Sequence, residues 1–202
     1  MMDGLQVAFI ASLLLGMRHA TDADHVVAIT TIVNGEQSLH RAARIGVMWG
    51  VGHTLTILAV GAAIILFKVV FTPRIGLSLE MTVAVMLMVL GALNLVQQSP
   101  VQRAPVLRPF IVGSVHGMAG SAAATLLIIP LIDDPRMALL YLAVFGLGTI
   151  GGMTIVTLVI AAPANLAASR FAGFDRSLRL ASGSMSLAFG AYLGYRAGFG
   201  LM

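Results

Sequence analysis

Six apolar stretches, separated by short polar breaks, constrain the fold of this 202-residue chain more than any other feature. Each is about 20 residues long or longer, the length that an α-helix needs to cross the hydrocarbon core of a bilayer. Only 10% of the residues are charged, too few to cover a soluble surface, so lipid must surround most of the exterior. We therefore predict an all-α membrane protein with six transmembrane helices, near residues 5–33, 43–67, 76–97, 109–132, 137–162 and 178–201.

The two halves of the chain resemble each other. Gly16-Met-Arg-His19 and Gly113-Ser-Val-His116 both place a histidine three residues after a glycine. Trp49-Gly-Val-Gly52 and Phe145-Gly-Leu-Gly148 repeat an aromatic-Gly-apolar-Gly pattern. The two pairs are offset by 97 and 96 residues, in the same order along the chain. Such agreement predicts an internal repeat.

A repeat of three spans has to be inverted, because an odd number of crossings turns the second copy over. Inverted repeats are a common construction of secondary transporters, which bind their substrate near the bilayer midplane between the repeats. We predict a 3+3 inverted repeat within a single transmembrane domain, residues 1–202. Its repeats span about 1–98 and 106–202, and the proline-rich segment 99–105 links them.

The distribution of basic residues predicts the orientation. Lysine and arginine are enriched in the cytoplasmic loops of membrane proteins. Seven of them lie in or beside the first, third and fifth breaks, and four lie at the other breaks or ends, so we predict both termini outside the cytoplasm. The seven are Arg41, Arg44, Arg103, Arg108, Arg170, Arg176 and Arg179, and the four are Lys68, Arg74, Arg136 and Arg196.

Composition excludes several other classes of protein. The net charge of +4 comes from basic residues scattered singly through the breaks, without the basic stripe that binds nucleic acid. There is no cysteine, which excludes disulfides, iron–sulfur clusters and thiolate metal sites. A metal site in this chain must therefore use nitrogen and oxygen ligands.

The ionisable side chains of the first predicted span are concentrated in one short segment. Residues 18–25, Arg-His-Ala-Thr-Asp-Ala-Asp-His, hold five side chains that are charged or can become so. An aspartate or arginine at the centre of a spanning helix costs about 2.5 to 3.5 kcal/mol, so such groups must be paired, hydrated or neutralised by a ligand. On a continuous helix, His19, Asp22 and His25 share one side, and Arg18 can pair with Asp22. Asp24 points away, unless the helix is unwound there.

Imidazole and carboxylate groups together suit Ni²⁺, Co²⁺, Zn²⁺, Mn²⁺ or Fe²⁺. The carboxylate charge also offsets the cost of bringing a divalent cation into a medium of low dielectric constant. We therefore predict metal ligands at His19, Asp22, Asp24 and His25. The alternative is a buried cluster of ion pairs that only locks helices together, a role that small residues usually fill in membranes.

Two further histidines are candidate ligands. The repeat places His116, in the fourth predicted span, opposite His19, so both can face one cavity. His53, in Trp49-Gly-Val-Gly-His-Thr54 of the second span, is either a ligand or a hydrogen-bond donor between helices. We predict that both belong to the metal site.

These motifs resemble those of the nickel/cobalt transporter family. His19-Ala-Thr-Asp-Ala-Asp24-His25 is similar to the family signature of a histidine, four residues, an aspartate and a histidine. Trp49-Gly-Val-Gly-His-Thr54 resembles the family's Gly-His-Ser/Thr element, and the segment 115–122 resembles the UreH-like membrane proteins of the same wider group. The resemblance implies a single-component permease that carries Ni²⁺ or Co²⁺ across the cytoplasmic (inner) membrane. It implies essential roles for His19, Asp24 and His25.

The prediction is thus a multi-pass permease whose divalent ion is substrate, with no cofactor and no catalytic residue. Lipid is its other partner, nucleic acid is not a partner, and a homo-oligomer is compatible with the sequence. Three alternatives stay open: an exporter or permease of another substrate, a membrane accessory protein for metal insertion into an enzyme such as urease or hydrogenase, and an intramembrane metalloenzyme. Against the metalloenzyme, the sequence contains no His-Glu-x-x-His motif, which is typical of zinc-dependent hydrolases.

Overall fold

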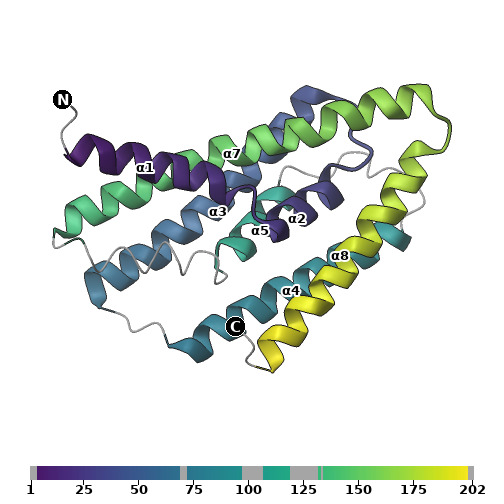
Figure 1. The fold of residues 1–202 in the computed structure, drawn as a ribbon. Helices are drawn as coiled ribbons and strands as arrows, with labels where there is room; N and C mark the ends of the chain where they lie inside the picture. Colours follow the sequence, from purple (N-terminus) through teal and green to yellow (C-terminus); the bar gives the residue numbers. More distant parts are fainter. Residues whose placement is uncertain (1–3, 69–71, 97–106, 119–131, 133, 200–202) are drawn as a thin grey trace.

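The computed structural model describes residues 4–68, 72–96, 107–118, 132 and 134–199 (Figure 1). All regular structure in these residues is helical, so the predicted all-α class is confirmed. Two expected segments lie outside the described residues: the linker 99–105, and residues 119–131 of the expected fourth span 109–132. The helices are α1 (Gly4–His19), α2 (Ala23–Val33), α3 (Leu39–Phe67), α4 (Pro73–Val96), α5 (Leu107–Gly117), α7 (Pro135–Arg170) and α8 (Phe174–Gly198).

Three of the described helices, α3, α4 and α7, are long and apolar enough to cross a membrane. They coincide with the expected spans 43–67, 76–97 and 137–162, and α7 extends further at its carboxyl end. Many large apolar side chains of these helices are exposed, such as Val159 of α7 and Val89 of α4. Exposed apolar side chains on long helices are what a lipid environment requires.

Local chemistry accounts for several helix ends. Ser38 precedes α3 and accepts a hydrogen bond from the backbone N–H of Arg41. Asp134 caps α7 in the same way, accepting from the N–H of Arg136, and Pro135 occupies the first helical position, where no N–H is needed. Gly173, with a φ of 83°, makes the left-handed turn between α7 and α8.

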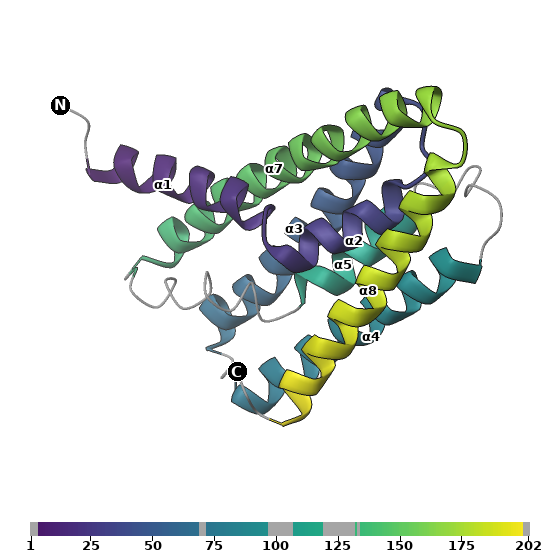
Figure 2. The same cartoon turned by 45° about the vertical axis from the view of Figure 1, so that its right-hand side comes forward.

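The first expected span, 5–33, is interrupted. The backbone N–H groups of Thr21 and Asp22 donate to carbonyls three residues back, which tightens the end of α1, and Asp22 then adopts an extended conformation with a ψ of 147°. Asp22 and Asp24 lie at the start of α2, where their negative charge is favourable for the helix dipole. The break separates α1 from α2 in both views (Figures 1 and 2).

The most extensive contacts among the described helices all join the first half of the chain to the second. They pair α1 with α7, α3 with α7, α3 with α5, and α4 with α8. Figures 1 and 2 both show α4 and α8 side by side, and α1 lying along α7. The shorter α2 contacts α3, α4, α7 and α8, and so lies within the bundle. The two halves are therefore interleaved.

Glycines make the close contacts between α1 and α7. A Cβ added at Gly16 would overlap the carbonyl oxygen of Phe145, and one added at Gly148 would overlap that of Leu13. The corresponding contacts recur between α3 and α5, where Gly113 lies against the carbonyl of Trp49 and Gly52 against that of Phe110. Such small residues allow helix backbones to approach closely in a membrane.

The same reciprocity holds between α4 and α8. Gly91 of α4 packs on Leu187, and Gly190 of α8 packs on Met88. The hydroxyl of Ser186 donates a 2.7 Å hydrogen bond from α8 to the carbonyl oxygen of Leu87 on α4. Gly91 and Gly190 thus face residues at equivalent positions of the two helices.

Candidate metal centre

The break between α1 and α2 brings four ionisable side chains to the inside of the bundle. His19 is the last residue of α1, Asp22 lies in the break, and Asp24 and His25 lie in the first turn of α2. Because the helix is interrupted, Asp24 does not point away from His19 and His25, as it would on a continuous helix. Its carboxylate instead contacts His25 and His116.

The other two candidates come from neighbouring helices. His53 lies on α3 and His116 near the carboxyl end of α5. A glycine contact brings these two helices together at the level of the histidines, since Gly117, next to His116, lies against the backbone of His53. All six candidate residues of the sequence analysis therefore gather in one cluster, which we call the histidine cluster: His19, Asp22, Asp24, His25, His53 and His116.

The four imidazoles of the histidine cluster are almost completely buried. The residues His25, His53 and His116 are 0% exposed and His19 is 7% exposed. The Asp24 side chain is 17% exposed and that of Asp22 is 44% exposed. Asp22 is therefore the part of the cluster that is most open to its surroundings.

Hydrogen bonds connect the carboxylates to the imidazoles. Nδ1 of His19 donates to Oδ2 of Asp22 at 2.9 Å. Nδ1 of His25 donates to Oδ1 of Asp24 at 3.0 Å, and Nε2 of His116 donates to Oδ2 of Asp24 at 2.9 Å. Carboxylate–histidine pairs of this kind fix the orientation of the imidazole ring. They also leave the other ring nitrogen unprotonated, with a lone pair that can bind a metal ion, as in many protein metal sites.

The pairing expected between Arg18 and Asp22 is not the one observed. Arg18 is exposed at the end of α1, and the ion pair that the described residues give Asp22 is with His19. The physical reason is the break in the helix, which removes the spacing of one helical turn on which the expected pair depended.

Three imidazole nitrogens of the cluster are buried without a hydrogen-bond partner among the described residues: Nε2 of His25, Nδ1 of His53 and Nδ1 of His116. A buried polar atom without a partner is costly, about 1 to 3 kcal/mol, and needs an explanation. An unprotonated imidazole nitrogen is a good ligand for a divalent transition metal ion. These atoms therefore suit the donor set of a metal site.

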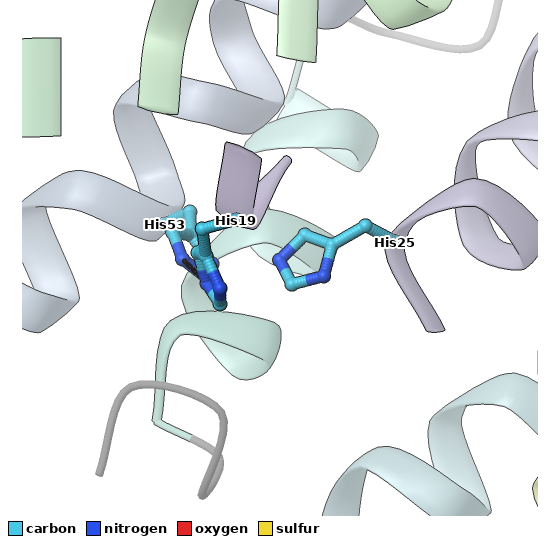
Figure 3. A group of neighbouring side chains, drawn as sticks. All are labelled: His19, His25 and His53. Carbon is cyan, nitrogen blue, oxygen red and sulfur yellow. Dashed lines mark hydrogen bonds between the residues drawn. The ribbon is translucent and has the colours of Figure 1, made fainter. Parts of the chain in front are cut away.

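Ligand atoms of the cluster form two close groups. One nitrogen each of His19, His25 and His53 lie within 4.8 Å of one another. The same holds for one ligand atom each of Asp24, His25 and His116. Figure 3 shows His25 pointing toward His19 and His53, which lie side by side, and Nε2 of His19 is 3.3 Å from Nε2 of His53.

Two aromatic side chains, which in the sequence are markers of the repeat, lie beside the cluster. The Trp49 ring centroid lies 5.6 Å from that of His25 and 6.0 Å from that of His116. The ring of Phe145 lies 5.6 Å from that of His19. Both rings are buried. Trp49 precedes His53 by one helical turn, and this spacing was the signal that could have assigned it to the site.

Comparison with known proteins agrees with the resemblance of the motifs. The sequence model of a family described as "NicO: High-affinity nickel-transport protein" matches residues 5–100. The chain is 33% identical to the "Urease accessory protein UreH" of Bacillus sp. (strain TB-90) over 218 aligned residues, which cover 98% of this chain and 95% of that protein. No solved structure matches the chain.

Proposed function

Because the chain belongs to the nickel/cobalt transporter family, in its UreH-like group, we propose that it is a permease that moves Ni²⁺ or Co²⁺ through the histidine cluster. Membership of the family and the apolar helices support a multi-pass membrane protein that transports a metal ion. The identity of the ion and the residues that bind it are the proposal. Such a permease has no catalytic residue and no cofactor, since the ion is its substrate.

The observation that supports the proposal most is the presence of buried imidazole nitrogens inside the bundle that have no hydrogen-bond partner in the described part of the chain. Three or four imidazoles with one or two carboxylates favour Ni²⁺, Co²⁺ and neighbouring transition metals over Mg²⁺ and Ca²⁺, which prefer oxygen ligands. A cluster that only locked helices would be expected to satisfy its own hydrogen bonds. The loss of these nitrogens' hydration is offset when an ion binds.

Reciprocal packing supports six spans arranged as a 3+3 inverted repeat. In this proposal α1 and α2 form one interrupted span, which corresponds to the span that begins with α5. Gly16 on Phe145 then corresponds to Gly113 on Trp49, and both helices α1 and α5 end beside a histidine. Interrupted helices that meet at the midplane are typical of the binding sites of secondary transporters.

Inward transport needs no nucleotide. A divalent ion that moves down a membrane potential gains about 2 × 2.3 kcal/mol per 100 mV. We propose the cytoplasmic (inner) membrane as the location, with both termini outside the cytoplasm, because the first, third and fifth breaks carry more of the basic residues.

Flux into liposomes tests the function. Purified protein is reconstituted, an inward potential is imposed, and uptake of ⁶³Ni²⁺ and ⁵⁷Co²⁺ is compared between wild type, His25→Ala and the control His40→Ala. His40 is an exposed histidine at the start of α3, outside the cluster. We expect uptake by wild type and His40→Ala, and a loss of at least tenfold in His25→Ala. Equal uptake by all three proteins and by empty liposomes would exclude the permease.

The similarity to a protein described as a urease accessory protein favours one further candidate, a membrane protein that hands metal ions to the assembly of a metalloenzyme. That function needs a partner protein, whereas a permease works alone. Uptake into liposomes that contain only this chain distinguishes the two: binding of ⁶³Ni²⁺ without flux would favour the accessory role.

A further inference from the structure

His25 belongs to both groups of ligand atoms in the histidine cluster. With His19 and His53 it forms a group of three imidazoles, and with Asp24 and His116 it forms a group of two imidazoles and one carboxylate. Each group supplies three ligands, the number that protein sites commonly give to an ion that exchanges its remaining ligands. A single ion would need ligand atoms about 3.4 Å apart, so each group must contract slightly to bind it.

The two ring nitrogens of His25 are directed to different groups. Nδ1 lies 3.0 Å from Oδ1 of Asp24, within the group that contains His116. Nε2 has no hydrogen-bond partner among the described residues. Figure 3 shows the His25 ring presenting the nitrogen remote from its backbone toward His19 and His53. The imidazole of His25 thus directs Nε2, which has no partner among the described residues, toward the first group. It directs Nδ1, which is hydrogen-bonded to Asp24, toward the second group.

The surroundings of the two groups are equivalent by the repeat. His19 and His116 lie at or next to the carboxyl ends of α1 and α5. The ring of Phe145 lies beside His19 as the ring of Trp49 lies beside His116, and these aromatic residues occupy matching positions of the repeat. His25, from α2, stands between the two equivalent histidines, with ring centroids 4.5 Å from His19 and 4.2 Å from His116.

Asp22 gives the more open approach to the cluster. Its side chain, hydrogen-bonded to His19 of the first group, is 44% exposed, whereas in the second group the Asp24 side chain is 17% exposed and both histidines are 0% exposed. An ion that approaches past Asp22 therefore meets the group of three imidazoles first.

We propose that the transported ion occupies two consecutive positions in the cluster and that His25 passes it from one to the other. The proposal rests on the proposed function. In the first position the ion is bound by His19, His53 and Nε2 of His25, and in the second by Asp24, His116 and Nδ1 of His25. The imidazole of His25 is neutral at both positions. With the ion on Nε2 its proton lies on Nδ1, and as the ion moves to Nδ1 that proton is released to water while Nε2 takes one proton from water, so that no net proton is exchanged.

Two positions that share a ligand explain how a buried site can release its ion. A site that held the ion with all six residues at once would bind it too tightly to let it leave, whereas conduction requires several weaker sites. The first position, with three nitrogen ligands, also selects transition metal ions against Mg²⁺ and Ca²⁺ before they reach the carboxylate of Asp24.

Binding of Ni²⁺ by purified protein tests this proposal. The number of ⁶³Ni²⁺ ions bound per chain is measured by equilibrium dialysis, and the number of imidazole ligands by X-ray absorption at the nickel edge. The variants are His53→Asn, His116→Asn and His25→Asn, with His40→Asn as the control outside the cluster. His→Gln at the same positions replaces any variant that does not elute as a folded species.

We expect His116→Asn to bind Ni²⁺ through three imidazoles and His53→Asn through two, because each retains one complete position. Both should lose at least tenfold in flux. His25→Asn, which damages both positions, should bind at least tenfold more weakly than either. Loss of all binding in His53→Asn or in His116→Asn would show one undivided site and overturn the proposal, as would wild-type flux in either variant. Failure of the wild type itself to bind Ni²⁺ would instead overturn the proposed function.

Discussion

Asp24 and His116 are hydrogen-bonded across the two halves of the chain, with 2.9 Å between Oδ2 of the carboxylate and Nε2 of the imidazole. The other oxygen of Asp24 accepts from Nδ1 of His25 at 3.0 Å. One carboxylate therefore holds two imidazoles from different helices in a fixed relation. In the proposed metal site this contact preorganises the ligands, which reduces the conformational cost of binding an ion.

Asp24→Asn tests the importance of this carboxylate. The amide has nearly the same shape but no charge, and its NH₂ group cannot accept a hydrogen bond from an imidazole. We expect the affinity for Ni²⁺ to fall roughly 10- to 100-fold or more, because the substitution weakens a proposed ligand and also removes the group that orients two imidazoles. Equilibrium dialysis with ⁶³Ni²⁺ measures the change.

Asp22→Asn is the matched control for Asp24→Asn. Its carboxylate contacts one histidine of the cluster and is 44% exposed, against 17% for Asp24. We expect a smaller loss of affinity. An equal loss in the two variants would contradict the central place that we give to Asp24.

Gly113→Ala tests the close contact of α5 with α3. The added methyl group would overlap the backbone carbonyl of Trp49, so α5 must move and carry His116 with it. We expect a loss of about 1 to 3 kcal/mol in the free energy of unfolding, the usual effect of overpacking. Thermal unfolding in detergent measures it, and the affinity for Ni²⁺ should fall as well.

The control for this variant is Gly151→Ala on α7, where an added Cβ meets nothing within 4 Å. Alanine is the better helix former by up to about 1 kcal/mol. Gly151→Ala should therefore unfold at the wild-type temperature or slightly above it. A similar destabilisation by both substitutions would show that the contact with Trp49 is unimportant.

Trp49→Ala tests the aromatic wall beside His25 and His116. Trp49 is the largest of the fully buried side chains, and its removal leaves a cavity, so we expect a loss of about 3 to 5 kcal/mol in the free energy of unfolding. Trp49→Phe fills most of the cavity and should lose much less. The exposed Phe67 at the end of the same helix is the control, and Phe67→Ala should leave the unfolding temperature unchanged.

Ni²⁺ should stabilise the folded protein. A ligand that binds only the folded state, present at 100 times its dissociation constant, adds about 2.7 kcal/mol to the free energy of unfolding. We therefore expect the unfolding temperature to rise with Ni²⁺ and not with Mg²⁺ at the same concentration. The rise should disappear in His25→Ala and persist in His40→Ala. A rise that survives in His25→Ala would place the bound ion elsewhere in the chain.

The sequence was informative about which residues gather, because polar groups inside apolar spans must find one another. His19 and His25 were predicted together for this reason, and the internal repeat placed His116 opposite His19. The structure brings these three residues and His53 to one cluster. The glycines at which helices approach closely were also predictable, since Gly113 and Gly148 recur at helical spacing with Gly117 and Gly152.

The direction of Asp24 was left open, because it depends on whether the helix is interrupted, and the expected span 5–33 was continuous. The break contains neither glycine nor proline, the residues that usually mark one. A signal was nevertheless present. Thr21 and Asp22 precede Ala23, and Asp24 follows in the first turn, which is the usual pattern of a helix start. The span 5–33 was predicted as one helix because its residues are apolar on both sides of this helix-start pattern.

The interleaving of the two halves has a consequence for how the protein is made. Helices α1 and α3 find their most extensive contacts on α5 and α7, which leave the ribosome later, since synthesis proceeds from the amino terminus. The early helices must therefore wait in the bilayer, each stable only as a single hydrogen-bonded helix, until the later ones are inserted. Assembly of the protein is complete only when the last segments arrive, and two fragments divided between α4 and α5 should become functional only when they are produced together.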